Sequence, residues 1–134
     1  MILFVCTGNT CRSPLAAALA RSVGIDAESA GLSARTGDPA TPQAVWAAED
    51  FGADLTRHRA KRVTVELLKQ ADRVYAMTEG HLLALQAAFP AYAGKMRVLE
   101  PAVPDPYGGD EAVYAQCVKS LRLAMRRAGI LSLR

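Results

Sequence analysis

The sequence predicts an α/β fold in which a parallel β-sheet carries helices on both faces. Short apolar runs alternate along the chain with segments that begin at helix-capping residues and end at Gly or Pro. Parallel strands need crossover connections, and helices of this kind supply them. At 134 residues with 51% hydrophobic residues, the chain is expected to form one domain over residues 1–134 with a substantial core.

The first half of the chain predicts two strands and three helices. Strands are expected at residues 2–5 and 27–30. The first helix is expected to begin at Ser13-Pro14, with Ser13 as N-cap and Pro14 at the first helical position. Thr41-Pro42 repeats this signal, and Gly52 ends that helix. A short helix is expected at residues 65–71.

The second half predicts two more strands, at residues 73–77 and 97–99. Thr78 is expected to cap a helix that stops before Pro90, and residues 100–109 form a loop rich in Pro and Gly. Asp110 then caps a long final helix, in which acidic residues at the start and arginines at the end suit the helix dipole. Its core-facing side chains at helical spacing are expected to be Tyr114, Val118, Leu121 and Met125.

Charge and hydropathy restrict the partners of the chain. The net charge of +3 and pI near 8.9 suit an acidic substrate, but no dense Lys/Arg stripe indicates nucleic acid. Residues 57–62 are basic and are interpreted as mostly a solvated segment. No apolar run reaches transmembrane length, and Met1 leads directly into a strand-like run. We therefore expect no membrane association and a cytoplasmic location.

The cysteines and histidines do not predict a metal site. In the cytoplasm the three cysteines are expected to be thiols available for catalysis or redox sensing. Three cysteines and two histidines show no convincing ligand spacing. No metal and no other cofactor is expected.

The most informative segment is FVCTGNTCRSP at residues 4–14, between the first expected strand and the first helix. Ligands of open α/β sheets bind beyond the carboxyl ends of the strands. Backbone N–H groups there can curl into an anion-binding nest, with the helix N-terminus adding positive potential. Gly8 supplies backbone freedom and Asn9 tolerates a left-handed conformation. The predicted phosphate-binding residues are Thr7, Gly8, Asn9, Thr10, Cys11, Arg12 and Ser13.

Cys6 and Arg12 supply the chemistry of this segment. The planar guanidinium of Arg12 suits two phosphate oxygens. The same positive field stabilises a Cys6 thiolate, which is an effective nucleophile toward phosphorus. The segment predicts a hydrolase of phosphate esters or phosphoramidates that works through a phosphocysteine. The alternative is that Cys6 is only a buried strand cysteine.

Asp105 is the candidate general acid. It lies between two prolines on the loop after the last expected strand. Parallel strands end on the same side of a sheet, so this loop can reach the rim near Cys6. A positioned acid accelerates departure of the leaving group. The alternative is an ordinary Asp-Pro turn.

These residues carry a resemblance to the low-molecular-weight protein tyrosine phosphatases over nearly the whole chain. VCTGNTCRSP is similar to the phosphate loop of that family, and DPYGG is similar to its acid loop. Further similar segments are ESAG at 28–31, HRAKR at 58–62, YAM at 75–77 and VYAQCV at 113–118. The resemblance implies a three-layer α/β sandwich with a four-stranded parallel sheet in the order 2-1-3-4.

The resemblance also implies roles for individual residues. It implies Cys6 as nucleophile, Arg12 as phosphate clamp, and Asp105 as general acid and then base for the attacking water. It further implies that Ser13 hydrogen-bonds the Cys6 thiolate.

A second set of implied roles concerns residues around the loop. Ser29 and His58 hold Asn9 in a strained conformation, although His58 alone would be interpreted as a surface residue. Cys117 matches a helical cysteine of the family and is interpreted as structural, and His81 as a surface residue.

The departures from the tyrosine-specific pattern bear on the substrate. Thr10 stands where those enzymes usually carry a larger aliphatic residue, and residues 31–39 contain no aromatic side chain. Tyr107 is followed by Gly108-Gly109, which leaves few stacking partners for a phosphotyrosine ring. The bacterial protein arginine phosphatases share the Thr and an Asp-Pro-aromatic-Gly-Gly loop. We therefore assign Thr10 and Tyr107 to the substrate cleft and favour protein phosphoarginine over phosphotyrosine.

The expected partners follow from that substrate: a phosphorylated protein and a cognate protein kinase. Two other functions stay open on the residues alone. An arsenate reductase uses a similar loop but relays a disulfide through further cysteines, of which only Cys117 remains. A non-catalytic phosphate-binding module needs neither a thiolate nor an acid.

Cys11 is a candidate redox partner of Cys6. After oxidation of Cys6, the Cys11 thiol could form a disulfide with it.

Overall fold

A computed structural model of the protein describes residues 1–131, so the last three residues of the expected 1–134 domain lie outside the described residues. Its centre is a four-stranded parallel sheet in the order β2-β1-β3-β4, which confirms the predicted fold class. The strands are β1 (Ile2–Cys6), β2 (Ala27–Gly31), β3 (Arg73–Ala76) and β4 (Met96–Val98).

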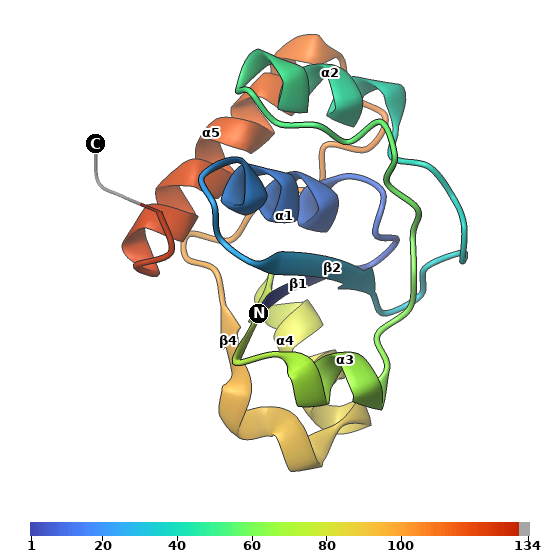
Figure 1. The fold of residues 1–134 in the computed structure, drawn as a ribbon, viewed down its shortest axis with the longest axis vertical. Coiled ribbons are helices and arrows are strands. Elements are labelled where there is room, and N and C mark those ends of the chain that lie inside the picture. The colour runs from blue at the N-terminus through green and yellow to red at the C-terminus, as the bar shows by residue number, and fades with distance from the viewer. Residues whose placement is uncertain (132–134) are drawn as a thin grey trace.

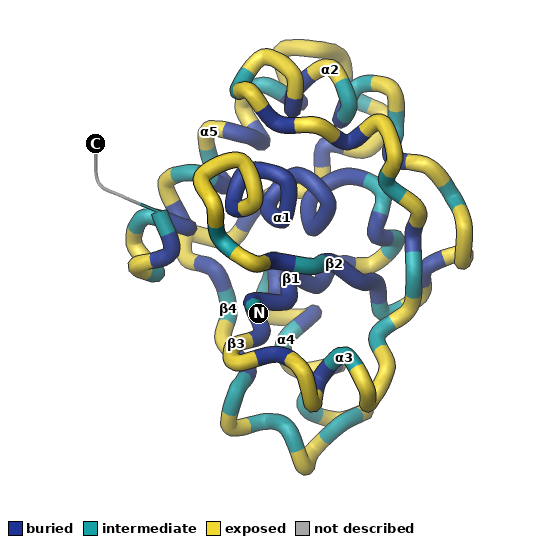
Figure 2. Tube along the Cα trace, in the orientation of Figure 1, coloured by how far each residue is buried: buried dark blue, intermediate teal, exposed yellow. Residues whose placement is uncertain are grey.

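Helices cover both faces of the sheet and give three layers (Figure 1). One face carries α1 (Arg12–Ser22), α2 (Pro42–Asp50) and α5 (Glu111–Arg127). The other carries α3 (Val65–Gln70), α4 (Glu79–Ala88) and the 3₁₀ helix η1 (Pro90–Lys95). The central strand β1 is buried along its whole length, as Figure 2 shows. Its side chains alternate between two cores: Phe4 and Cys6 pack with α1 and α5, and Leu3 and Val5 with α3 and α4.

The predicted helix caps are confirmed except at α1. The Thr41, Thr78 and Asp110 side chains accept hydrogen bonds from N–H groups of the helices that they precede. Helix α1 instead begins at Arg12, after Cys11, with no side-chain cap. The prediction of Ser13 as N-cap was therefore wrong. The Ser13 hydroxyl lies within the first turn and contacts Cys6 and Asn9 instead.

The other differences are at the ends of elements. Strands β1 and β2 each run one residue further than predicted because Cys6 and Gly31 pair. Strand β3 ends one residue early, β4 is shifted back by one residue, and the sequence reading missed η1. The core-facing side of α5 is confirmed, since its four predicted residues are each at most 1% exposed.

No helix in the described part of the chain is long and apolar enough to span a bilayer.

Candidate active site

The segment from Thr7 to Cys11 connects the carboxyl end of β1 to the N-terminus of α1, at the middle of the sheet. Backbone N–H groups of the segment after β2 donate hydrogen bonds to carbonyl groups at the start of this loop. Leu32 N–H donates to the Cys6 carbonyl at 3.0 Å, and Ser33 N–H donates to the Thr7 carbonyl at 3.0 Å. The segment after β2 therefore fixes the start of the loop, and the first turn of α1 presents its uncapped N-terminus there.

Gly31, at the end of β2, lets these two segments approach closely. A Cβ atom on Gly31 would lie 2.6 Å from the Thr7 carbonyl oxygen and 3.1 Å from Asn9 Cβ. Any side chain would push the phosphate loop away from β2. The packing of the loop thus requires glycine at position 31. The sequence analysis included Gly31 only as part of a segment similar to the family.

Asn9 is the one non-glycine residue with positive φ, 57°, in the described part of the chain, and it is fully buried. Its amide Nδ2 donates to Ser29 Oγ at 2.9 Å, and its Oδ1 accepts Lys61 N–H at 3.0 Å. His58 Nε2 lies 2.6 Å from the Asn9 carbonyl oxygen. A carbonyl can only accept, so Nε2 carries a hydrogen. These bonds hold a left-handed turn that would otherwise cost about 1–2 kcal/mol.

Ser13 links Asn9 to Cys6. Asn9 Nδ2 donates to Ser13 Oγ at 2.9 Å, and Ser13 Oγ lies 2.9 Å from Cys6 Sγ. The Ser13 hydroxyl hydrogen has two acceptors within reach, the Cys6 sulfur at 2.9 Å and the Ala30 carbonyl oxygen at 3.5 Å, and the sulfur is the closer. The sulfur lies at the base of the loop, with Cys6 only 3% exposed.

Arg12 joins the phosphate loop to the acid loop. Its guanidinium Nη1 donates to the Val103 carbonyl at 3.1 Å, and Nη2 lies 3.8 Å from Asp105 Oδ2. Val103 N–H in turn donates to the Met77 carbonyl, just beyond β3, at 3.1 Å. The Arg12 side chain is 7% exposed, so a largely buried cation is oriented by one backbone carbonyl and one loosely paired carboxylate.

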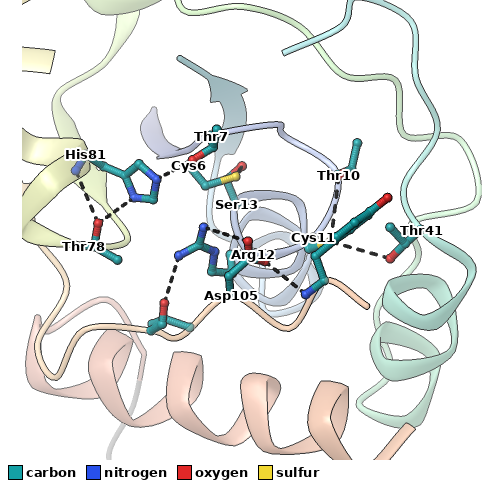
Figure 3. Close-up of polar contacts among 12 residues, drawn as sticks. Cys6, Thr7, Thr10, Cys11, Arg12, Ser13, Thr41, Thr78, His81 and Asp105 are labelled. Atoms are coloured by element: carbon teal, nitrogen blue, oxygen red, sulfur yellow. Dashed lines mark hydrogen bonds and ion pairs between the residues drawn. The ribbon is translucent and has the colours of Figure 1, made fainter. Parts of the chain in front are cut away.

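The structure brings Asp105 to the rim of this site, with its side chain 58% exposed (Figure 3). Tyr107 N–H donates to Asp105 Oδ1 at 3.1 Å, which fixes the carboxylate within its turn. Oδ2 faces Arg12. Tyr107 itself is 74% exposed, beside Asp105 in sequence. The structure thus pairs Arg12 with Asp105, and Cys6 contacts Ser13, the residue that follows Arg12 in the sequence.

The far side of the loop is braced by α2 and α5. Thr41 N–H donates to the Thr10 carbonyl at 3.1 Å. Cys11 Sγ lies 3.3 Å from Tyr114 Oη and 3.8 Å from Thr10 Oγ1. Burial raises the pKa of the Tyr114 hydroxyl, so it stays protonated. The sequence reading assigned Tyr114 only to the core and missed this polar contact.

His81 corrects the sequence reading, which placed it on the surface. It is 9% exposed, and its Nε2 lies 2.8 Å from Thr7 Oγ1. Burial lowers the pKa of His81, and the Arg12 charge lowers it further, whereas Asp105 raises it. A histidine in the first turn of the helix that follows β3 is the signal that could have revealed it, since that turn lies at the carboxyl edge of the sheet.

Cys117 lies in α5 and is 4% exposed. Burial raises the pKa of its thiol to about 12. A protonated thiol is a poor nucleophile. In the described part of the chain, no three His, Cys, Asp or Glu side chains gather as metal ligands would.

Comparison with known proteins decides the family. Residues 1–128 match the family described as low molecular weight phosphotyrosine protein phosphatase. The chain belongs to this family. The matched range includes every residue of the site described above.

Relatives in this family carry two different substrate names. The protein-arginine-phosphatase of Bacillus subtilis is 37% identical to this chain, and the match covers 94% of this chain and 92% of the Bacillus protein. The probable low molecular weight protein-tyrosine-phosphatase EpsP of Ralstonia solanacearum is 38% identical, and the match covers 79% of this chain and 77% of EpsP. A solved structure of YwlE arginine phosphatase, a cysteine-to-serine mutant with a phosphorylated active-site serine, has a TM-score of 0.89 at 36% identity. It matches 95% of this chain and 91% of that structure. The chain is a phosphoprotein phosphatase of this family.

Proposed function

We propose that the protein hydrolyses phosphoarginine in proteins through a phosphocysteine formed on Cys6. The observation that carries the choice of substrate is the loop itself, in which Thr10 supplies a hydroxyl where an aliphatic side chain would favour an aromatic ring. A Cβ added to Gly8 would lie 3.7 Å from Thr10 Oγ1, so this hydroxyl lies beside Gly8 within the loop. A polar side chain there suits a polar guanidinium next to the phosphoryl group.

The first chemical step transfers the phosphoryl group to sulfur. The Cys6 thiolate attacks phosphorus, the P–N bond of phosphoarginine breaks, and Asp105 gives its proton to the departing guanidinium nitrogen. Arg12 and the backbone N–H groups of residues 7–13 hold the phosphoryl oxygens as charge builds on them. Ser13 contacts the Cys6 sulfur through its hydroxyl, and Ser29 and His58 act only through Asn9.

The second step releases phosphate. Asp105, now a carboxylate, accepts a proton from water, and that water attacks the phosphocysteine. The S–P bond breaks, inorganic phosphate leaves and the Cys6 thiolate is restored. These steps use no metal or other cofactor, because Arg12 and the loop supply the positive field. The phosphorylated serine of the solved YwlE mutant supports a covalent step at the corresponding position.

A cognate protein kinase and a cytoplasmic location complete the proposal, since the enzyme needs a supply of phosphorylated protein and a reduced Cys6.

Under oxidants we expect the Cys6 thiol to become a sulfenic acid. The Cys11 thiol then reacts with this sulfenic acid, water leaves and a disulfide forms. Peroxide should then inactivate the enzyme reversibly, with loss of two hydrogens between these residues. Irreversible sulfinic acid at Cys6 would contradict this role for Cys11.

Phosphotyrosine is the second candidate substrate. The exposed Tyr107 ring supports it, because one aromatic side chain at the rim could stack on a phosphotyrosine ring. Arsenate reduction is disfavoured, since the Cys117 thiol is held protonated and within a helix. A pure phosphate-binding module is disfavoured by the placement of Asp105 against Arg12.

The test is a side-by-side assay on peptides of one sequence carrying phosphoarginine, phosphotyrosine or phosphoserine. We expect the highest kcat/KM with phosphoarginine and no turnover of any peptide by Cys6→Ser. A higher kcat/KM with phosphotyrosine would overturn the choice of substrate and leave the phosphatase assignment in place.

A further inference from the structure

One buried titratable group at the site has no part in the proposed reaction. The ring of His81 lies between two threonines: Nε2 is 2.8 Å from Thr7 Oγ1, and Nδ1 is 3.0 Å from Thr78 Oγ1 (Figure 3). His81 is buried, whereas Thr7 is exposed at the mouth of the phosphate loop, next to Cys6. The ring therefore connects a helix cap behind the site to a hydroxyl at its opening.

The hydrogen bonds at Thr78 indicate which atoms donate in the series of hydrogen bonds from Thr78 through His81 to Thr7. Thr78 Oγ1 accepts the backbone N–H of His81 at 3.3 Å as the cap of α4. Among the described residues, His81 Nδ1 is the one acceptor within reach of the Thr78 hydroxyl hydrogen, so an unprotonated Nδ1 is what satisfies that hydrogen. Nε2 then carries the ring hydrogen and donates it to Thr7 Oγ1. The Thr7 hydroxyl keeps its own hydrogen for a third atom.

The charges around His81 favour a neutral ring. Arg12 and Asp105 are the charged groups that act on it, and burial together with Arg12 outweighs Asp105 and lowers its pKa. A neutral ring has one hydrogen, so its tautomer decides whether Thr7 donates or accepts. An anionic phosphoryl oxygen strengthens a hydrogen bond from a hydroxyl. Phosphate in the loop should therefore stabilise the tautomer in which the Thr7 hydrogen is left for it.

We propose that His81 is a positioning residue of the active site: braced by Thr78, it holds Thr7 so that the Thr7 hydroxyl donates to an oxygen of the bound phosphoryl group. The inference rests on the proposed function only in that residues 7–13 bind a phosphoryl group, whichever amino acid carries it. A neutral donor at this place adds a hydrogen bond without opposing the charge of Arg12.

The kinetic test compares pairs of variants on p-nitrophenyl phosphate. Thr7→Val keeps the shape of the side chain and removes the hydroxyl, and Thr7→Ser keeps the hydroxyl. We expect kcat/KM to fall about tenfold in Thr7→Val, as for a hydrogen bond to a charged group, and to stay within about twofold in Thr7→Ser. His81→Gln, which can still donate to Thr7, should retain more activity than His81→Phe. The double variant Thr7→Val/His81→Phe should be no worse than its poorer single variant, because both changes remove one interaction.

A spectroscopic test reads the tautomer directly. The chain has two histidines, so ¹⁵N-histidine labelling with His81→Gln as reference assigns both rings in a long-range ¹H–¹⁵N spectrum. With saturating inorganic phosphate we expect His81 to be neutral, with hydrogen on Nε2 and none on Nδ1. Hydrogen on Nδ1 alone, or equal kcat/KM for Thr7→Val and Thr7→Ser, would overturn the proposal. A wild-type protein that neither binds phosphate nor hydrolyses p-nitrophenyl phosphate would overturn the proposed function as well.

Discussion

The Nε2 atom of His58 lies 2.6 Å from the backbone carbonyl oxygen of Asn9, whose φ is 57°. A histidine from the segment before α3 thereby holds a left-handed residue inside the phosphate loop. The Asn9 side chain continues the connection through Ser13 to Cys6 Sγ. The backbone shape of the loop and the hydroxyl contact of the Cys6 sulfur thus depend on the same few side chains.

We expect Asn9→Ala to lower the free energy of unfolding by about 2–4 kcal/mol. The variant loses bonds to Ser13, Ser29 and Lys61, and it places a β-carbon without compensation at positive φ. Asn9→Gly loses the same bonds but adopts this φ freely, so it should be about 1 kcal/mol more stable than Asn9→Ala. Urea unfolding measures both, and equal stabilities would show that backbone strain at this position is unimportant.

Gly31→Ala should damage the site through packing alone. The added Cβ would meet the Thr7 carbonyl at 2.6 Å, so the loop must shift, at a cost of about 1–3 kcal/mol with loss of phosphatase activity. Gly94→Ala is the matched control, because a Cβ there has no atom within 4 Å. Its melting temperature and kcat/KM should equal those of the wild type. Similar effects of the two substitutions would contradict the close approach of β2 to the loop.

Acidification should destabilise the protein through its two histidines. Burial is the main cause that lowers the pKa of both His58 and His81 below the ordinary value of about 6.5. The unfolded chain therefore binds protons that the folded chain does not, so stability is full above about pH 6.5 and falls as the pH drops from there toward the folded pKa values. Urea unfolding between about pH 7.5 and 5.5 measures this slope. In His58→Asn/His81→Gln the slope should be shallower, and an unchanged slope would assign it to other groups.

Thr10→Ile tests the choice of substrate. An aliphatic side chain removes the hydroxyl beside Gly8 and adds apolar surface that suits an aromatic ring. We expect the ratio of kcat/KM for phosphotyrosine over phosphoarginine peptides to rise about tenfold. An unchanged ratio would remove Thr10 from the determinants of specificity.

Asp105→Asn tests the general acid by comparing two leaving groups. Turnover of a phosphorylated peptide should fall by about 10²–10⁴-fold, because the leaving group needs a proton. Turnover of p-nitrophenyl phosphate should fall less, since nitrophenolate is stable without one. Equal losses on both substrates would indicate that Asp105 acts by positioning Arg12 rather than by proton transfer.

The fold was predictable because its signals are local. Apolar runs mark the strands, and Thr41, Thr78 and Asp110 mark helix starts by side-chain capping, which the structure confirms. Ser13-Pro14 carries the same signal, but the cap that it predicts is wrong. The helix begins one residue earlier, at Arg12, with no side-chain cap, and the Ser13 hydroxyl contacts Cys6 and Asn9 instead.

The contacts within the site depend on distant segments and were less accessible. A lone histidine such as His81 has no pattern that distinguishes a surface position from a bond to Thr7, 74 residues away. The carbonyl of Val103, which orients Arg12, is a backbone group that any residue type would supply. The juxtaposition of Arg12 and Asp105 was expected because parallel strands end at one edge of the sheet and because the family resemblance implied both residues in one site.

The central claim is that Cys6 receives the phosphoryl group, and rapid-quench mass spectrometry tests it most directly. The enzyme is mixed with a phosphoarginine peptide, quenched within the first turnover and digested. We predict phosphate on Cys6, formed before inorganic phosphate is released, and none at position 6 of Cys6→Ala under the same conditions. Release of inorganic phosphate in the first turnover with Cys6 unmodified, or at an undiminished rate from Cys6→Ala, would contradict the account.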